Sequence, residues 1–152
     1  FNKVVPNIKW PNDILIKKAK VAGILIENIA LSKSPNILNI GFGINIVSNP
    51  TNTLYPATNL KAEGIETNSK EFIKVFFKNL KSFEEIYISE GINEIYRIWS
   101  LLGHKIGEPI SVKIGEKKIL GSFNGLNKDG GLLILDNAGI EKVVMAGDVF
   151  LL

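Results

Sequence analysis

The sequence of 152 residues contains no cysteine, one histidine and one arginine. Without cysteine, disulfide bridges and thiolate metal sites are excluded, and a reducing cytosol is compatible with the chain. The single histidine, His104, excludes a cluster of histidine metal ligands. No apolar run reaches membrane-spanning length, because charged residues or prolines interrupt every such stretch. We therefore expect a cytoplasmic protein that does not act through a membrane.

Charge of one sign is not concentrated anywhere in the sequence. The net charge is +3, and the densest basic group is Lys17, Lys18 and Lys20. A nucleic-acid surface would need a basic face with a recognisable reading element, and neither is visible. The last fifty residues have only two aromatic residues, Phe123 and Phe150, which is too few for a base-stacking platform. Nucleic-acid binding is therefore expected only if a domain upstream supplies it.

Hydrophobic residues make up 45% of the chain and charged residues 22%, which suits one ordinary domain or two small ones with a packed core. Apolar runs separated by turn formers predict β-strands around residues 7–16, 21–29 and 37–47, with turns at 11–13 and 32–35. Residues 48–68 are loop-like. Apolar residues at three- and four-residue steps then predict helices over residues 69–89 and 91–102.

Two details of the helical region carry expectations of their own. Ser69 is placed to cap the first helix, and Gly103 is placed to end the second. The aromatic stripe from Phe72 to Tyr87 is expected to be core rather than a ligand site. His104, next to a predicted helix end, is expected to be solvated between two domains.

After residue 104 the pattern changes to short strands. These are predicted at residues 110–114, 118–125, 131–135, 140–145 and 149–152, with glycine-containing turns between them. Five short strands in about fifty residues are typical of a small closed or partly open barrel. We therefore expect two domains, at residues 1–103 and 104–152.

The turn at residues 9–13, Lys-Trp-Pro-Asn-Asp, is the most informative stretch for chemistry. It offers a cation, an amide and a carboxylate at one end of a sheet. A carboxylate can hold magnesium that bridges phosphate oxygens, and a lysine can offset polyphosphate charge. The alternative is a plain hairpin turn, since proline, asparagine and aspartate are common in any turn. Trp10 is expected to be a core residue.

Glycines interrupt the two apolar strands that follow. Gly23 lies in the run KVAGIL at residues 20–25, and Gly41 and Gly43 lie in GFGIN at residues 41–45. Glycine weakens a strand and marks close approach by a ligand or another backbone. The alternative is a set of β-bulges in a tightly packed sheet.

In this order and spacing, KWPND, KVAGIL and GFGIN resemble the second half of the biotin protein ligase catalytic domain. The segment YPATNL at residues 55–60 is similar to the stretch that follows in that family. The resemblance implies an α+β fold, with a mixed sheet and helices of the class II synthetase-like biotin/lipoate ligase type, followed by a Src-homology-3-like barrel. It is specific over residues 9–60 and architectural beyond them.

The resemblance implies an ATP- and magnesium-dependent ligase that forms biotinyl-adenylate and transfers biotin to a lysine of a biotin carboxyl carrier protein domain. Lys20 would act in catalysis by contacting both the biotin carboxylate and the α-phosphate. Asp13 would be the second catalytic residue, either as a magnesium ligand or on the acceptor side. The other residues implied are Gly23, Ile24, Gly41 and Gly43 for biotin, and Lys9, Asn12, Ile44 and Asn45 for ATP or the adenylate.

The sequence departs from the family in one respect. The family's arginine-rich ligand loop, of the type GRGRxGR, is absent, and the only arginine is Arg97 on a predicted helix. Together with the abrupt start at Phe1, this leads us to expect a truncated chain with little ligase activity by itself. Such a chain is expected to need a homodimer partner or the missing N-terminal half.

Two alternatives stay open on this evidence. The chain could be a non-catalytic remnant that acts as a binding module. It could also be related to lipoate ligases, although KWPND followed by KVAGIL favours biotin.

Overall fold

The computed structural model describes residues 4–29, 37–53 and 55–151. The described chain forms two compact units. The first comprises residues 1–7 and 12–75, and the second comprises residues 8–11 and 76–152. The predicted turn at residues 32–35 lies outside the described residues.

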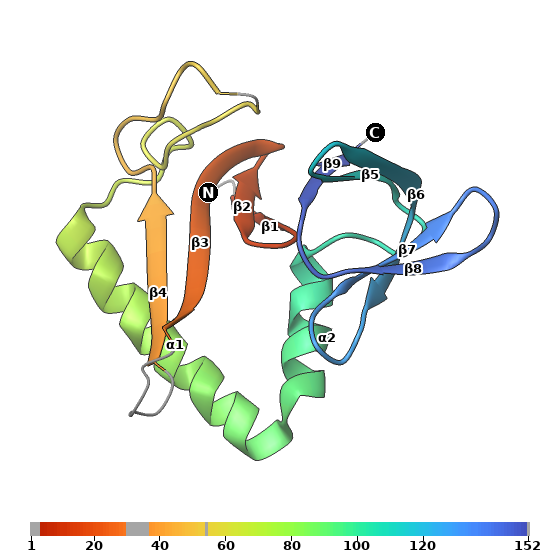
Figure 1. Ribbon diagram of the computed structural model, residues 1–152. Helices are drawn as coiled ribbons and strands as arrows, with labels where there is room; N and C mark the ends of the chain where they lie inside the picture. The colour runs from red at the N-terminus through yellow and green to blue at the C-terminus, as the bar shows by residue number, and fades with distance from the viewer. Residues whose placement is uncertain (1–3, 30–36, 54, 152) are drawn as a thin grey trace. The chain divides into compact units, whose positions relative to one another are not determined.

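The first sheet contains four strands in the order β1-β2-β3-β4 (Figure 1). The strands are β1 (Asn7–Lys9), β2 (Asp13–Ile16), β3 (Ala19–Ile29) and β4 (Ile37–Ile44). The ladders β2–β3 and β3–β4 are antiparallel, so the predicted mixed sheet is wrong for these strands. Lys17 and Lys18 join β2 to β3 with φ of 50° and 67°. Positive φ at both central residues is what a two-residue hairpin turn requires if it is to match the strand twist.

A small core holds the first unit together. Ile16, Val21 and Leu60 are buried, and Phe72 packs against them from the first helix. That helix, α1 (Ser69–Glu90), begins after Asn68, whose side-chain oxygen accepts a hydrogen bond from the backbone N–H of Glu71 at 3.0 Å. Asn68 is therefore the N-cap, and the expectation that Ser69 caps the helix is wrong by one residue.

The expected aromatic core stripe from Phe72 to Tyr87 on α1 holds at Phe72 and is wrong at the far end of the helix. No residue of α1 is buried in the described chain, and Phe77, Phe83 and Tyr87 are exposed. The helix is amphipathic in sequence, as predicted.

The second unit contains helix α2 (Ile92–Leu102) and a five-stranded antiparallel sheet. Its strands are β5 (Pro109–Ile114), β6 (Lys117–Leu126), β7 (Leu132–Asp136), β8 (Glu141–Val144) and β9 (Asp148–Leu151). Their order is β8-β7-β6-β5-β9, which leaves β8 and β9 as edges among the described residues. The α+β class and the five short strands are confirmed, whereas a closed Src-homology-3-like barrel is not.

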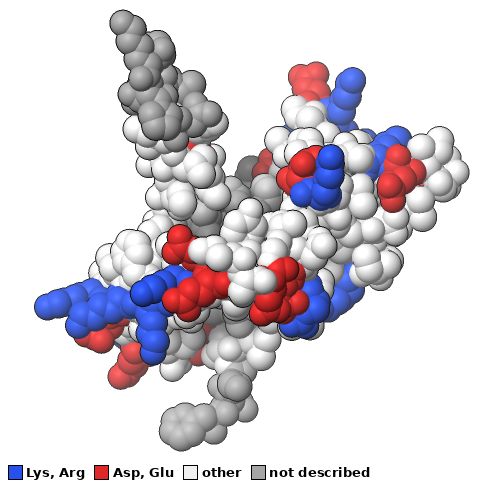
Figure 2. All heavy atoms as spheres, turned by 90° about the horizontal axis from the view of Figure 1, so that it is seen from below, with Lys and Arg blue, Asp and Glu red and all other residues white. Residues whose placement is uncertain are grey.

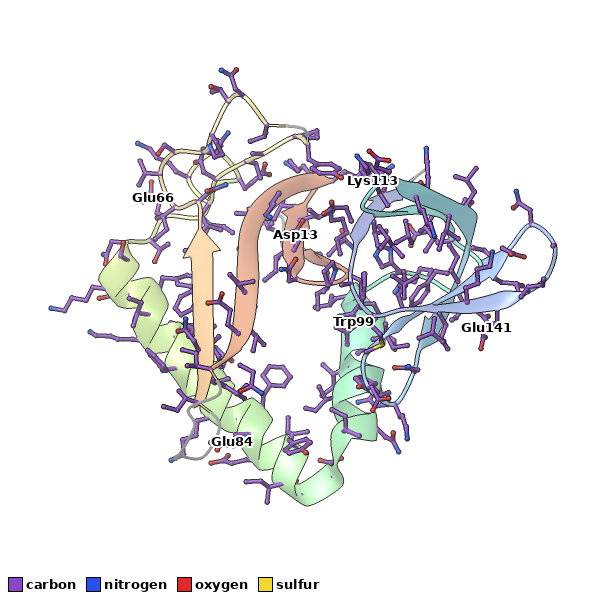
Figure 3. All side chains as sticks on the ribbon, viewed as in Figure 1. Asp13, Glu66, Glu84, Trp99, Lys113 and Glu141 are labelled. Carbon is purple, nitrogen blue, oxygen red and sulfur yellow. The ribbon has the colours of Figure 1, made fainter. Side chains whose placement is uncertain are left out.

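The core of the second unit is larger and comes from alternate positions of the strands. Its buried members are Trp10, Ile110, Val112, Phe123, Leu132, Ile134, Val144 and Val149. Trp99 of α2, labelled in Figure 3, packs against this core. Its ring centre lies 6.0 Å from that of Phe123. Gly103 ends α2 as predicted, with extended backbone after its N–H has donated to the Trp99 carbonyl. Only glycine fits there, because a Cβ would lie 2.5 Å from the Trp99 ring.

Charged side chains of both signs are interspersed on one face of the molecule (Figure 2). On the face drawn in Figure 2, lysine and arginine lie beside aspartate and glutamate, with uncharged areas between them. This face offers no continuous basic stripe of the kind that nucleic-acid binding uses.

Candidate active site

The first unit contains a pocket of about 690 Å³. It lies along β3, between the start of β2, the end of β4 and the loop that follows β4. Nine of the predicted site residues line it: Asn12, Asp13, Lys20, Gly23, Ile24, Gly41, Gly43, Ile44 and Asn45. Residues 20–25 and 41–45 meet here because β3 and β4 pair in antiparallel register, with Gly23 opposite Gly43.

Lys20 and Asp13 form an ion pair at this pocket. Lys20 Nζ lies 2.5 Å from Asp13 Oδ1, and the two side chains are 43% and 11% exposed. Asp13, labelled in Figure 3, begins β2, and the β2–β3 register pairs it with Gly23 of β3. A lysine ammonium carries three N–H donors, so a half-exposed lysine can keep its carboxylate and also meet an incoming anion.

Gly23 makes room for this pair. A Cβ on Gly23 would lie 3.1 Å from Lys20 Nζ and 3.4 Å from Asp13 Oδ1. The close approach that the glycine signalled in the sequence is therefore that of the Lys20 side chain. The distance to Lys20 Nζ is shorter than an ordinary van der Waals contact, and the distance to Asp13 Oδ1 is at its lower limit. Any larger residue at position 23 would therefore displace the Lys20 side chain from its place beside Asp13.

Gly41 and Gly43 have a different effect. Nothing lies within 4 Å of a Cβ added to Gly43, and only the Leu25 carbonyl lies near one added to Gly41. The β3–β4 register runs without a shift from Ile44 to Ile37, so the alternative of bulges at these glycines is wrong. Their missing side chains leave open space at the pocket wall. The irregularity in this sheet is instead in the β2–β3 pairing, between Ile14 and Leu15.

The loop after β4 is hydrogen-bonded to the backbone of Lys20. The Lys20 N–H donates to the Pro56 carbonyl at 2.8 Å, and the Thr58 N–H donates to the Lys20 carbonyl at 2.9 Å. Asn45 Nδ2 donates to the Thr58 carbonyl at 2.9 Å. Asn45 therefore holds the loop beside the lysine, a structural task that the sequence did not reveal.

A second ion pair fixes the same loop from the β2–β3 turn. Lys17 Nζ lies 2.9 Å from Glu63 Oε2, and Thr58 Oγ1 donates to Glu63 Oε1 at 2.8 Å. Hydrogen bonds from Lys17 and then from Thr58 lower the pKa of the Glu63 carboxyl. The carboxylate stays charged at neutral pH and keeps both contacts.

Sequence reasoning missed seven residues that line the pocket: Val21, Ala22, Leu25, Pro50, Thr53, Tyr55 and Ala57. The last four come from the loop after β4. Val21, Ala22 and Leu25 belong to the run KVAGIL, and Tyr55 and Ala57 belong to the stretch 55–60 that is similar to the family, but neither similarity assigned these residues a role.

Lys9 is not among the pocket-lining residues in the described chain. It is counted with the second unit, where it is buried, and its neighbour Trp10 is 4% exposed in that unit's core. Trp10 is thus a core residue, as expected.

The expectation of a solvated His104 is wrong, because its side chain is buried in the same unit. Burial lowers the pKa of the His104 imidazole, and the hydrogen bond to Glu108 offsets part of that effect.

Acidic residues are sparse at the pocket. Among the described residues, no three histidine, cysteine, aspartate or glutamate side chains come close enough together to hold a metal ion by themselves. Asp13 is the acidic residue among those that line the pocket. In the described part of the chain, no helix has the length and hydrophobicity needed to cross a membrane.

Comparison with known families adds to this geometry. Residues 1–45 match the biotin/lipoate A/B protein ligase family, and residues 105–152 match the biotin protein ligase C-terminal domain. The chain belongs to the biotin protein ligase family. The recognition made from KWPND, KVAGIL and GFGIN is confirmed.

Curated relatives of this chain are named as ligases. It is 30% identical over 147 residues to the bifunctional ligase/repressor BirA of Escherichia coli, covering 95% of this chain and 46% of that protein. It is 28% identical over 149 residues to the biotin–[acetyl-CoA-carboxylase] ligase of Paracoccus denitrificans, covering 94% and 62%. The chain therefore spans about half the length of the curated relatives it matches.

Solved structures of the family share the fold. The apo biotin protein ligase of Aquifex aeolicus matches with a TM-score of 0.77 and 25% identity, over 97% of this chain and 66% of that one. The same ligase in complex with biotin and ATP matches with a TM-score of 0.77 and 27% identity, over 97% and 62%.

Proposed function

We propose that this chain forms part of the active site of an ATP-dependent biotin protein ligase. In the first step, a biotin carboxylate oxygen attacks the α-phosphate of ATP, forming biotinyl-adenylate and releasing pyrophosphate. In the second, a lysine amine of a carboxyl carrier domain attacks the mixed anhydride, forming an amide and releasing AMP. The observation that carries the proposal is the Lys20–Asp13 pair, for which Gly23 makes room, on a pocket whose wall Gly41 and Gly43 leave open.

Lys20 suits the first step because two anions must approach each other there. A fixed cation between a carboxylate and a phosphate stabilises the charge that develops as they react. The partial exposure of Lys20 leaves its ammonium accessible to such ligands, while Asp13 holds it in place. Its role is electrostatic, and no covalent lysine intermediate is required.

The pocket walls suit the rest of the substrate. We propose that Gly23, Ile24, Gly41 and Gly43 present backbone to biotin, since a Cβ at Gly43 would enter open space. Asn12, Ile44 and Asn45 would flank the adenylate from the same pocket. Support comes from the Aquifex aeolicus ligase, a fold match that holds biotin and ATP.

Magnesium would reach this site with the nucleotide. Magnesium is commonly held by one or two protein carboxylates together with substrate phosphates and waters. A single pocket carboxylate, Asp13, fits that pattern, whereas a cage made of protein ligands alone does not. The ion would supply charge neutralisation at the phosphates, and Asp13 would hold it at one oxygen.

Further parts of the proposal concern partners and organisation. We propose that residues 104–152 form a C-terminal domain that docks the carrier protein or closes over ATP. The complete site is proposed to need the arginine-rich loop from a homodimer partner or from an N-terminal half. A cytoplasmic location fits this activity.

Biotin-dependent exchange of labelled pyrophosphate into ATP tests the proposal directly. The natural polypeptide that carries residues 1–152 is assayed with magnesium, and lipoate replaces biotin in a parallel arm. Lys20→Met should lower kcat/KM by about a hundredfold or more, the usual effect of removing a group that stabilises developing charge.

Lys18→Met is the matched control, because Lys18 is an exposed lysine two residues away. It should leave the exchange rate unchanged. Exchange that depends on lipoate and not on biotin, or no exchange at all, would overturn the proposal. Equal losses in the two lysine variants would remove Lys20 from the chemistry.

A further inference from the structure

Lys20 lies at an irregularity of the first sheet. Leu15 of β2 is opposite Lys20, whereas the residue before it is opposite Ala22. The β2–β3 register therefore passes over Val21, and an extra residue of this kind is a β-bulge. A bulge interrupts the ladder of hydrogen bonds, redirects the side chains around it and is common beside active sites. The position of the Lys20 backbone therefore depends on more than the pairing of β2 with β3.

The loop after β4 supplies hydrogen bonds at this bulge. The bonds from the Lys20 N–H to Pro56 and from the Thr58 N–H to Lys20 form a parallel bridge between Lys20 and Ala57. The bridge is isolated and lies outside the strands of the sheet. Because no ladder continues on either side of it, its position depends on how the loop itself is fixed.

Thr58 joins this bridge to the rest of the first unit. Its side chain is buried, and its hydroxyl donates to Glu63 Oε1 at 2.8 Å. The other oxygen of that carboxylate, Glu63 Oε2, lies 2.9 Å from Lys17 Nζ. Because Lys17 precedes Lys20 by three residues in the chain, these contacts close a ring that contains the carboxylate, the loop and the catalytic lysine.

The carboxylate of Glu63 has a fixed base. The Glu63 N–H donates to the carbonyls of Asn59 and Leu60 at 3.2 and 3.1 Å, within one turn of the loop. Leu60 is buried in the core of the first unit, together with Ile16 and Val21. The side chain of Glu63 is 11% exposed, so it is also enclosed by its surroundings. The turn that carries the carboxylate is therefore anchored in the same core as β2 and β3.

From this geometry we infer that Glu63 is a positioning residue for the proposed ligase reaction. It acts through the Thr58 hydroxyl on the backbone of Lys20, whose ammonium is the cation of the proposed first step. Neither Glu63 nor Thr58 is among the residues that line the pocket in the described chain, so neither is placed to touch substrate. All of these residues belong to the first unit. The inference rests on the proposed function.

The lysine needs such support because its side chain is long and 43% exposed. A shift of its Cα atom is passed on to the ammonium, and misplacement of a reacting geometry by about 1 Å costs about a hundredfold in rate. Loss of the Glu63 carboxylate should therefore lower kcat through Lys20. A carboxylate that merely stabilised the loop would change the free energy of unfolding, and its effect on kcat would not depend on Lys20.

Two substitutions at position 63 separate the hydrogen bond from the rest of the side chain. Glu63→Gln keeps an amide oxygen that can accept from the Thr58 hydroxyl, whereas Glu63→Ala removes the acceptor. Glu66→Ala is the matched control, because Glu66 is an exposed glutamate three residues away.

The experiment measures biotin-dependent pyrophosphate exchange in the natural polypeptide that carries residues 1–152. We expect Glu63→Ala to lower kcat by about tenfold, as for a misplaced catalytic group, with KM for biotin changed by less than about twofold. Glu63→Gln should recover kcat to within about threefold of the original, and Glu66→Ala should leave it unchanged.

Thr58→Val tests the same hydrogen bond from its other end. It removes the hydroxyl with little change of shape and should lower kcat by about the same tenfold factor. The double variant Thr58→Val/Glu63→Ala should lose no more than either single variant, because both changes delete one interaction. Fully additive losses would show that the two side chains act separately, which would overturn the inference.

A Lys20→Met background shows whether the effect passes through the lysine. There, Glu63→Ala should lower the residual exchange by less than about twofold, because the group that Glu63 positions is gone. The same loss in both backgrounds, or an unchanged kcat in Glu63→Ala, would overturn the positioning role and leave the proposed function intact. Absent exchange in the natural protein would instead sink the proposed function.

Discussion

Hydrophobic strand residues are buried in the second unit and largely exposed in the first. In the second unit, Ile110, Leu132 and Ile134 are fully buried. In the first unit, Leu25 and Leu38 are more than half exposed, although they belong to the long strands β3 and β4. The comparison teaches that strands of similar hydrophobicity can be buried or exposed in one protein. The strands of the second unit form a packed core, whereas β3 and β4 of the first unit leave apolar side chains exposed beside the pocket.

Core truncation should give the largest contrast between the units. Leu132→Ala removes a fully buried side chain and should lower the free energy of unfolding by about 2–5 kcal/mol. Leu38→Ala, at a residue that is 63% exposed, should change it by no more than about 0.5 kcal/mol. Denaturant unfolding of both variants measures this. Similar losses would mean that the β4 surface is covered in solution.

The glycines of the pocket should separate stability from ligand binding. Gly23→Ala would displace the Lys20–Asp13 pair and should weaken biotinyl-adenylate binding by about tenfold, or about 1.4 kcal/mol. Gly43→Ala meets no protein atom and should leave the unfolding free energy nearly unchanged while narrowing the pocket. Calorimetric titration and thermal unfolding of both variants check this. A Gly43→Ala variant that binds the adenylate normally would place the ligand elsewhere.

Removal of the helix cap should have a smaller effect. Asn68→Ala deletes the acceptor for the Glu71 N–H and should cost about 1 kcal/mol of unfolding free energy. Ser69→Ala is the control, and it should change stability by only a few tenths of a kcal/mol. Urea unfolding compares the two. A larger loss of unfolding free energy in Ser69→Ala than in Asn68→Ala would show that Ser69 is the N-cap, as the sequence pattern predicted.

The pH dependence of the second unit should be the mildest effect. Because burial lowers the pKa of His104 in the folded state, the unfolded state binds the proton more readily. The stability contributed by neutral His104 is therefore present above its ordinary pKa of about 6.5, and is lost as pH falls from there towards the lower folded value. H104Q should remove this part of the acid dependence. An unchanged acid profile in H104Q would assign the dependence to other groups.

Local pattern was sufficient for the strands and helices. The alternation and turn residues around β5 to β9 located five strands within one or two residues, and three-to-four spacing located α1 and α2. The Asn68 cap was missed because helix ends are ambiguous by a residue when several capping types are adjacent. The closed barrel was not confirmed because strand pairing at the sheet edges depends on long-range geometry that short strands do not encode.

The pocket residues were predictable to the extent that a motif carried them. Lys20, Gly23 and Gly43 were selected from KVAGIL and GFGIN, and all three line the pocket. The Lys20–Asp13 contact could not be predicted, because it depends on the register of the β2–β3 pairing. That register shifts between Ile14 and Leu15, and the sequence does not show the shift. The burial of His104 was missed because its partner Trp10 lies 94 residues away, beyond any local window.

The backbone hydrogen bonds of Lys20 also offer a way to measure how often the loop after β4 opens. The Lys20 N–H donates to the Pro56 carbonyl, and the Thr58 N–H donates to the Lys20 carbonyl. Both amide hydrogens are therefore protected by the same pairing of β3 with the loop. Deuterium should enter the Lys20 and Thr58 amides at matched rates, because one opening event exposes both. Paired amides of this kind would report each release of the loop without any label on substrate or side chain.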